Sequence, residues 1–106
     1  MGKNKDIDEL TNLMSRSLRH KIGSMVNKDE IYANKYAKDA ENIMKEAEKV
    51  FLRHHWDDYD RHEIKKQLRM KLRKELEEKD FLDNKKFDLM DEEIHKALKG
   101  FGLGIK

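Results

Sequence analysis

Three of the five histidines and the only tryptophan of this chain lie in one short stretch at its centre, residues 53–63. If a helix ran through the stretch, His54, Asp58 and His62 would share one face, because each follows the previous one by four residues. Imidazole and carboxylate groups are ligands that zinc and related divalent metals accept. The spacing therefore permits a metal site formed by these three side chains.

A turn between two helices is the competing interpretation of the same stretch. The stretch contains three aspartates, which are poor residues for a helix interior and good N-terminal caps. Asp60 followed by Glu63 matches a cap with an acid three residues later. No His-Glu-x-x-His motif is present. We therefore favour a helix break near residues 56–59, with Trp56 and Tyr59 packing on its apolar side, and we expect neither a metal nor another cofactor.

The sequence also lacks the usual signatures of an enzyme. Without cysteine, the chain can form neither a disulfide nor a catalytic thiolate. It contains no nucleophile elbow and no glycine-rich loop placed to bind phosphate before a helix. We expect a non-enzymatic protein with no catalytic residues.

Charge is distributed unevenly along the chain, although the net charge is only +2. Residues 28–60 carry six basic and nine acidic side chains, whereas residues 61–74 carry seven basic and one acidic. A basic helix of this kind can contact nucleic-acid phosphates, and basic residues near 16–19 could extend it. The candidate nucleic-acid-binding residues are Arg16, Arg19, Lys65, Lys66, Arg69 and Arg73. The alternative is that the acidic second helix lies antiparallel to the basic third one and neutralises it.

These side chains must be positioned by helices, because Leu, Lys, Glu, Ala and Met dominate the composition and proline is absent. Four helix starts are predicted wherever Asp or Asn is followed three residues later by an acid. The four pairs are Asp6 with Glu9, Asn27 with Glu30, Asp60 with Glu63, and Asp88 with Asp91.

After the predicted helix starts, apolar residues recur at helical spacing. In the first helix they are Ile7, Leu10, Met14, Leu18, Ile22 and Met25. In the third they are Ile64, Leu68, Leu72 and Leu76, and in the last they are Leu89, Met90, Ile94, Ala97 and Leu98. Residues 81–87 lack this spacing and are predicted to form a loop.

The second predicted helix, from about residue 28 to about residue 54, has the alternating steps of three and four that are typical of a coiled-coil seam. Its alanines would allow a neighbouring helix to approach closely. Together with two leucines of the third helix it forms the candidate interaction seam, which comprises Ala33, Tyr36, Ala40, Ile43, Ala47, Val50, Leu68 and Leu72. The long seam leads us to expect a helical interaction module that associates with itself or acts as a small subunit of a larger intracellular assembly.

We predict an all-α fold, a small three- to four-helix bundle with a long second helix. Residues 1–100 are expected to form a single helical domain, and residues 101–106 a flexible tail of apolar residues and glycine. No apolar run approaches the length of a membrane span, and the N-terminal residues do not form a signal peptide. We therefore expect a cytoplasmic protein with no membrane partner.

Overall fold

The computed structural model describes residues 2–26, 30–78 and 85–101. Within these residues it contains four helices and no strand, which confirms the predicted all-α bundle. The helices are α1 (Gly2–Val26), α2 (Glu30–Phe51), α3 (Asp58–Glu77) and α4 (Lys85–Gly100). The second helix is long, at 22 residues, but the first is longer, at 25.

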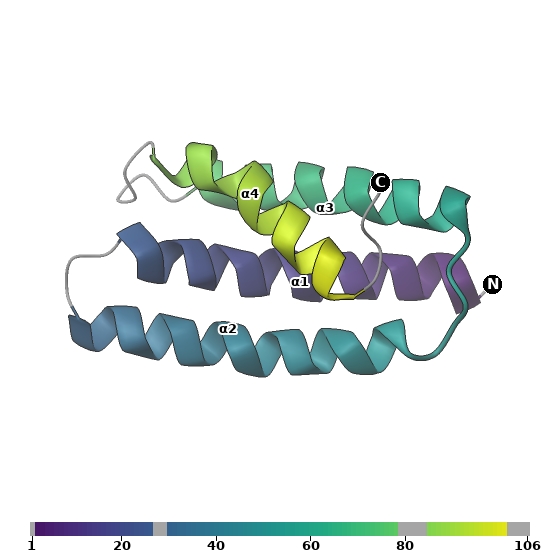
Figure 1. The fold of residues 1–106 in the computed structure, drawn as a ribbon, viewed down its shortest axis with the longest axis horizontal. Coiled ribbons are helices and arrows are strands. Elements are labelled where there is room, and N and C mark those ends of the chain that lie inside the picture. Colours follow the sequence, from purple (N-terminus) through teal and green to yellow (C-terminus); the bar gives the residue numbers. More distant parts are fainter. Residues whose placement is uncertain (1, 27–29, 79–84, 102–106) are drawn as a thin grey trace.

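α1 occupies the middle of the molecule. It lies between α2 and α3, and α4 crosses the same face of α1 and α3 obliquely (Figure 1). α1 contacts each of the other three helices, and α3 also contacts α4. Among the described helices, α2 contacts α1 alone. The alternative in which α2 lies antiparallel to α3 and neutralises it is therefore wrong, because α1 separates the two helices.

α3 joins the core through a leucine seam, which we define as Ile64, Leu68, Leu72 and Leu76. All four side chains are 0% exposed. They belong to one hydrophobic cluster with the apolar stripe of α1, of which the members from Ile7 to Ile22 are buried. Met25, the last predicted member of the α1 stripe, is instead 48% exposed.

α2 packs on α1 through an alanine seam, which we define as Ala40, Ala47 and Val50. These three residues are buried, whereas the other predicted members of the stripe, Ala33, Tyr36 and Ile43, are only partly buried. The Ser17 hydroxyl on α1 donates a 2.7 Å hydrogen bond to the Ala40 carbonyl, which holds the two helices close together. The helix-to-helix seam predicted from the sequence is thus used mainly within the chain.

The break between α2 and α3 falls at residues 52–57 and is fixed by a capping box. The Asp57 side chain accepts a 2.8 Å hydrogen bond from the Asp60 backbone N–H, and the Asp60 side chain accepts a 3.1 Å bond from the Asp57 N–H. The predicted cap at Asp60 is therefore wrong by one turn, because Asp60 is the acid that reaches back. Trp56 is buried as predicted, but Tyr59 is 75% exposed.

Two further predicted starts also differ from the structure. α1 begins at Gly2, so Asp6 lies inside the helix, and α4 begins at Lys85, so Asp88 lies in its first turn. The start predicted at Asn27, most of the predicted loop and the tail after Phe101 lie outside the described residues. Phe101 itself is partly buried and its ring stacks on Phe51, with 5.0 Å between centroids.

Candidate functional site

The structure does not bring His54, Asp58 and His62 together as ligands. The break after α2 places His54 in the turn, whereas Asp58 and His62 are exposed at the start of α3. Within the residues that the structure describes, no group of three histidine, cysteine or acidic side chains could hold a metal ion.

His54 has a structural partner at the N-terminal end of α1. Its Nε2 lies 2.5 Å from Asp6 Oδ2, and the Arg53 guanidinium lies 3.2 Å from Asp6 Oδ1. The hydrogen bond with His54 holds the pKa of Asp6 below its ordinary value, against partial burial and with help from the Arg53 charge. This cluster ties the turn between α2 and α3 to α1.

The predicted nucleic-acid-binding residues lie away from α2. Lys65 and Lys66 are exposed on α3, and Arg16 is exposed on α1. The other three are near carboxylates: Arg19 lies 3.2 Å from Glu75, Arg69 lies 3.6 Å from Asp91, and Arg73 lies 3.2 Å from Glu77. None of these six cations pairs with an acid of α2 in the described part of the chain.

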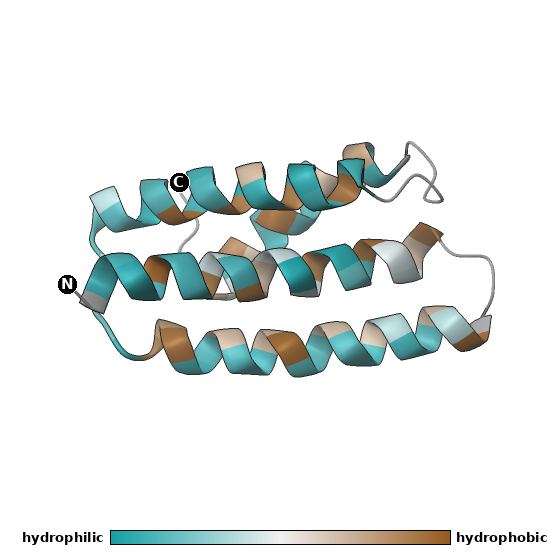
Figure 2. Cartoon of the chain, turned by 180° about the vertical axis from the view of Figure 1, so that it is seen from behind, coloured by the Kyte–Doolittle hydropathy of each residue, from teal (hydrophilic) through white to brown (hydrophobic). Residues whose placement is uncertain are grey.

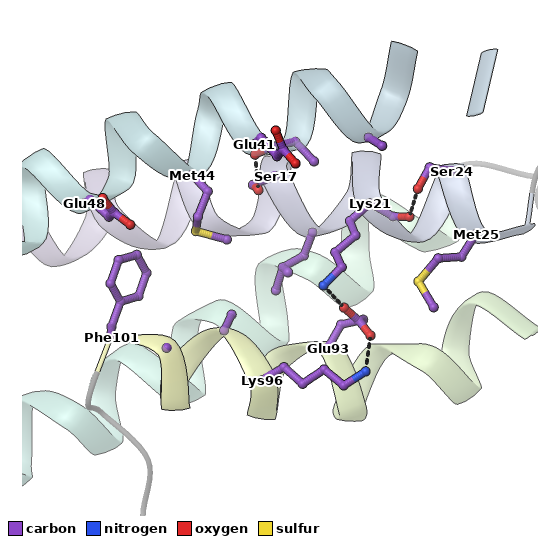
Figure 3. Close-up of a pocket in the computed structure, with 15 residues that line it drawn as sticks. Ser17, Lys21, Ser24, Met25, Glu41, Met44, Glu48, Glu93, Lys96 and Phe101 are labelled. Atoms are coloured by element: carbon purple, nitrogen blue, oxygen red, sulfur yellow. Dashed lines mark hydrogen bonds and ion pairs between the residues drawn. The ribbon is translucent and has the colours of Figure 1, made fainter. Parts of the chain in front are cut away.

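A groove opens between α2 and α4. Both helices pack on α1, but within the described residues their backbones do not approach each other. The ring of Phe101, directly after α4, stacks on Phe51 at the end of α2. The groove has a volume of about 440 Å³, and its floor is α1 (Figure 3). We call it the α2–α4 groove; its lining residues are Ser17, Leu18, Lys21, Ser24, Met25, Ala37, Ala40, Glu41, Met44, Glu48, Glu93, Lys96, Ala97, Gly100 and Phe101.

The lining is mostly apolar and contains two flexible thioethers. Met25 enters from α1 and Met44 from α2, while Phe101 closes the end beside α4 (Figure 3). Small residues, chiefly Ala37 and Ala97, leave the space between them open. Because Met side chains adapt to different shapes, these walls can adjust to a ligand.

The α4 wall contains a buried carboxylate with two half-exposed lysine partners. The Glu93 side chain is 0% exposed, and Lys21 Nζ lies 2.6 Å from its Oε1. That contact is an ion pair without hydrogen-bond geometry, whereas Lys96 donates a 3.4 Å hydrogen bond to Oε2. The pKa of Lys96 is raised above its ordinary value by its hydrogen bond to Glu92 and by the charge of Glu93. Two lysines therefore neutralise the carboxylate on this side of the groove.

The α2 wall has the opposite character. Glu41 and Glu48 line the groove, are exposed, and make no ion pair with another described residue. They are seven residues apart, so they share one face of α2 and lie about 10 Å from each other along the helix. Two carboxylates without an ion pair beside a mostly apolar lining are a feature that the sequence did not lead us to expect. The sequence does contain a pattern that indicates this wall. It is a second stripe on α2 at helical spacing, formed by Ala37, Glu41, Met44 and Glu48.

The described helices form a small all-α bundle with a groove between α2 and α4. No helix in the described part is long and apolar enough to cross a membrane. No protein-family model matches the chain, and neither a curated protein nor a solved structure matches it. Functional inference therefore depends on the surfaces themselves.

Proposed function

We propose that this protein is a non-enzymatic interaction module that binds one amphipathic helix of a partner protein in the α2–α4 groove. The observation that supports the proposal most directly is that α2 and α4 both pack on α1 and leave the space between them open. Helix-in-groove recognition of this kind places apolar anchors at helical spacing into a groove of matching length.

The length of the groove suits such a ligand. Its α2 wall runs from Ala37 to Glu48, which corresponds to about 16 Å, or three turns of helix. A volume of about 440 Å³ lies in the range of roughly 300–1,000 Å³ that is typical of ligand sites. An elongated, open, Met-lined groove fits a row of anchors better than one compact molecule.

The charges of the walls indicate the chemistry of the helix. Glu41 and Glu48 favour Lys or Arg on the flank of the ligand that faces α2, with a spacing of seven residues. The α4 wall attracts no such partner because Lys21 and Lys96 already surround Glu93. The proposed ligand is therefore a helix that has an apolar stripe and basic residues on one flank of that stripe.

A second copy of this chain fits the groove less well. Each described helix turns its apolar stripe into the shared core, so none is free to enter the groove of another molecule. Among the exposed apolar residues, Ile31 lies at the start of α2 and Leu52 lies in the turn after its end, so the two do not form a stripe. We therefore assign the groove to another protein.

The experiment uses a designed helical peptide with a leucine stripe and lysines along one flank, and measures binding by fluorescence anisotropy. We expect saturable binding that Met44→Glu weakens by at least about tenfold, because the new charge would be covered by the peptide. Met70→Glu, the same replacement on the exposed side of α3, is the matched control and should leave binding unchanged.

Failure of the peptide to bind, or equal loss in both variants, would contradict the proposal. Sedimentation analysis covers the alternative occupant. A dimer that forms at micromolar concentration and excludes the peptide would assign the groove to a second copy instead.

A further inference from the structure

From Lys65 to Lys74, every exposed side chain of α3 except Met70 is basic. The leucine seam occupies one side of the helix, and the residues on the other side are exposed. Figure 2 shows that α3 is mainly hydrophilic along its outer side. We define the α1–α3 basic face as Arg16 of α1 together with Lys65, Lys66, Arg69, Arg73 and Lys74 of α3. All six are exposed. Only Met70, at 63% exposure, places a large apolar side chain among them.

Most of this charge is not neutralised within the protein. In the part of the chain that the structure describes, Arg16, Lys65, Lys66 and Lys74 make neither an ion pair nor a side-chain hydrogen bond. The Arg69–Asp91 and Arg73–Glu77 pairs are more than half exposed on both sides. Exposed pairs are weak and exchange readily, so a phosphate can replace the carboxylate.

α1 extends the basic face across a shallow hollow beside α3. Arg16, Lys71 and Lys74 line this hollow with Asn12, Ser15, Glu75 and Glu78. Lys71 is already bound to Asp8 and Thr11, and Glu75 contacts Arg19. Arg16 and Lys74 therefore remain available, one from each helix.

We propose that the α1–α3 basic face binds the phosphate backbone of nucleic acid. From Lys65 to Lys74 the face is about 13 Å long, and double-stranded DNA presents one negative charge per roughly 1.7 Å of axis, so several phosphates lie within reach. Backbone contacts require cations but no apolar pocket, which matches this surface. An acidic protein would need apolar anchors as well, and the face offers none apart from Met70.

The basic face is separate from the α2–α4 groove, and this proposal does not depend on the groove. Arg16 and the groove residue Lys21 are five residues apart, which places them about 140° apart around the axis of α1. One molecule can therefore bind a partner helix and nucleic acid at the same time.

The experiment measures binding of labelled duplex DNA and duplex RNA by anisotropy, between about 50 and 200 mM salt. The test variant combines Lys66→Gln, Arg73→Gln and Lys74→Gln. The matched control combines Lys35→Gln, Lys38→Gln and Lys45→Gln, which removes the same charge from exposed positions of α2. Because all six positions are exposed, both variants should keep the circular dichroism spectrum of the original protein.

We expect salt-sensitive binding that the test variant weakens by at least about tenfold. The slope of log affinity against log salt should fall by up to about three, since each lost phosphate contact removes about 0.9. The control should retain at least half of the affinity. No binding at low salt, or equal losses in the two variants, would overturn the proposal. Competition by polyglutamate as effective as that by DNA at equal charge would overturn it in favour of an acidic protein.

Discussion

α1 packs on its two long neighbours through interfaces of different composition. α3 contributes the leucine seam, in which every member is a large side chain with no exposed surface. α2 contributes the alanine seam, in which two of the three members are alanines and the neighbouring stripe residues are only partly buried.

The two interfaces therefore differ in role: the leucine seam mainly stabilises the fold, whereas the alanine seam leaves part of α2 free for binding. Each large side chain of the leucine seam contributes about 1.5–3 kcal/mol by leaving water, so this interface holds much of the hydrophobic free energy. Alanine contributes less but allows a close approach of helix axes, which the Ser17–Ala40 hydrogen bond reflects. α2 is held by this narrow seam, and its second stripe remains free to form a wall of the α2–α4 groove.

The largest expected effect is the loss of a leucine from the leucine seam. Leu68→Ala leaves a cavity at a position with no exposure, so we expect the free energy of unfolding to fall by about 2–5 kcal/mol in urea denaturation. Met70→Ala, on the exposed side of the same helix, should change it by less than about 0.5 kcal/mol. Similar values for the two variants would show that the leucine seam is not the stabilising interface.

The alanine seam should respond to added volume instead. Ala47 is 0% exposed against α1, so Ala47→Leu forces the helices apart and should destabilise the protein by about 1–3 kcal/mol. Ala37→Leu makes the same replacement at an exposed position of the groove wall and should leave stability nearly unchanged while it narrows the groove. If Ala47→Leu is neutral in thermal denaturation, the two helices are not closely packed there.

The smallest expected effect concerns the turn that joins the helices of the two seams. Burial raises the pKa of Asp60, but Lys3, whose ammonium lies 2.6 Å away, and hydrogen bonds with Asp57 outweigh it, so the pKa lies below its ordinary value. A carboxyl with a lowered folded-state pKa stabilises the fold above the unfolded pKa of about 3.9 and loses that contribution as the pH falls through the folded-state value.

We therefore expect the free energy of unfolding, measured in urea, to decline as the pH falls below about 4, and Asp60→Asn to reduce that decline. Asp58→Asn, at an exposed position of the same helix start, is the control and should retain it. An identical pH dependence in the Asp60 variant would assign the acid sensitivity to other carboxylates.

Apolar spacing was sufficient to predict the all-α fold and most of the core faces of α1 and α3. The leucine seam and the buried stripe of α1 follow directly from it, because a side chain every three or four residues must face the same neighbour. The break near Trp56 was also predicted from its aspartates. Helix starts were less predictable, since Asp6 binds His54 and Arg53 rather than capping α1.

The α2–α4 groove could not be predicted, because it depends on which helices touch. The apolar stripes of α2 and α4 predict that each helix buries one face. They do not predict that both helices pack on α1 and leave a groove between them. The sequence equally allowed α3 to lie against α2, and then the α1–α3 basic face would have met acids instead of solvent. In the structure Arg73 and Lys66 are exposed, and α1 lies between α3 and the acids of α2.

The central position of α1 limits how this protein can evolve. A replacement at Leu10, Met14 or Leu18 disturbs a helix that supports all three others, so it requires compensating changes elsewhere in the chain. The outer residues of α2 are under no such restriction, since that helix rests on α1 alone. We expect lineages to diverge fastest along the groove wall, which would let an inherited scaffold acquire new partners without losing its core.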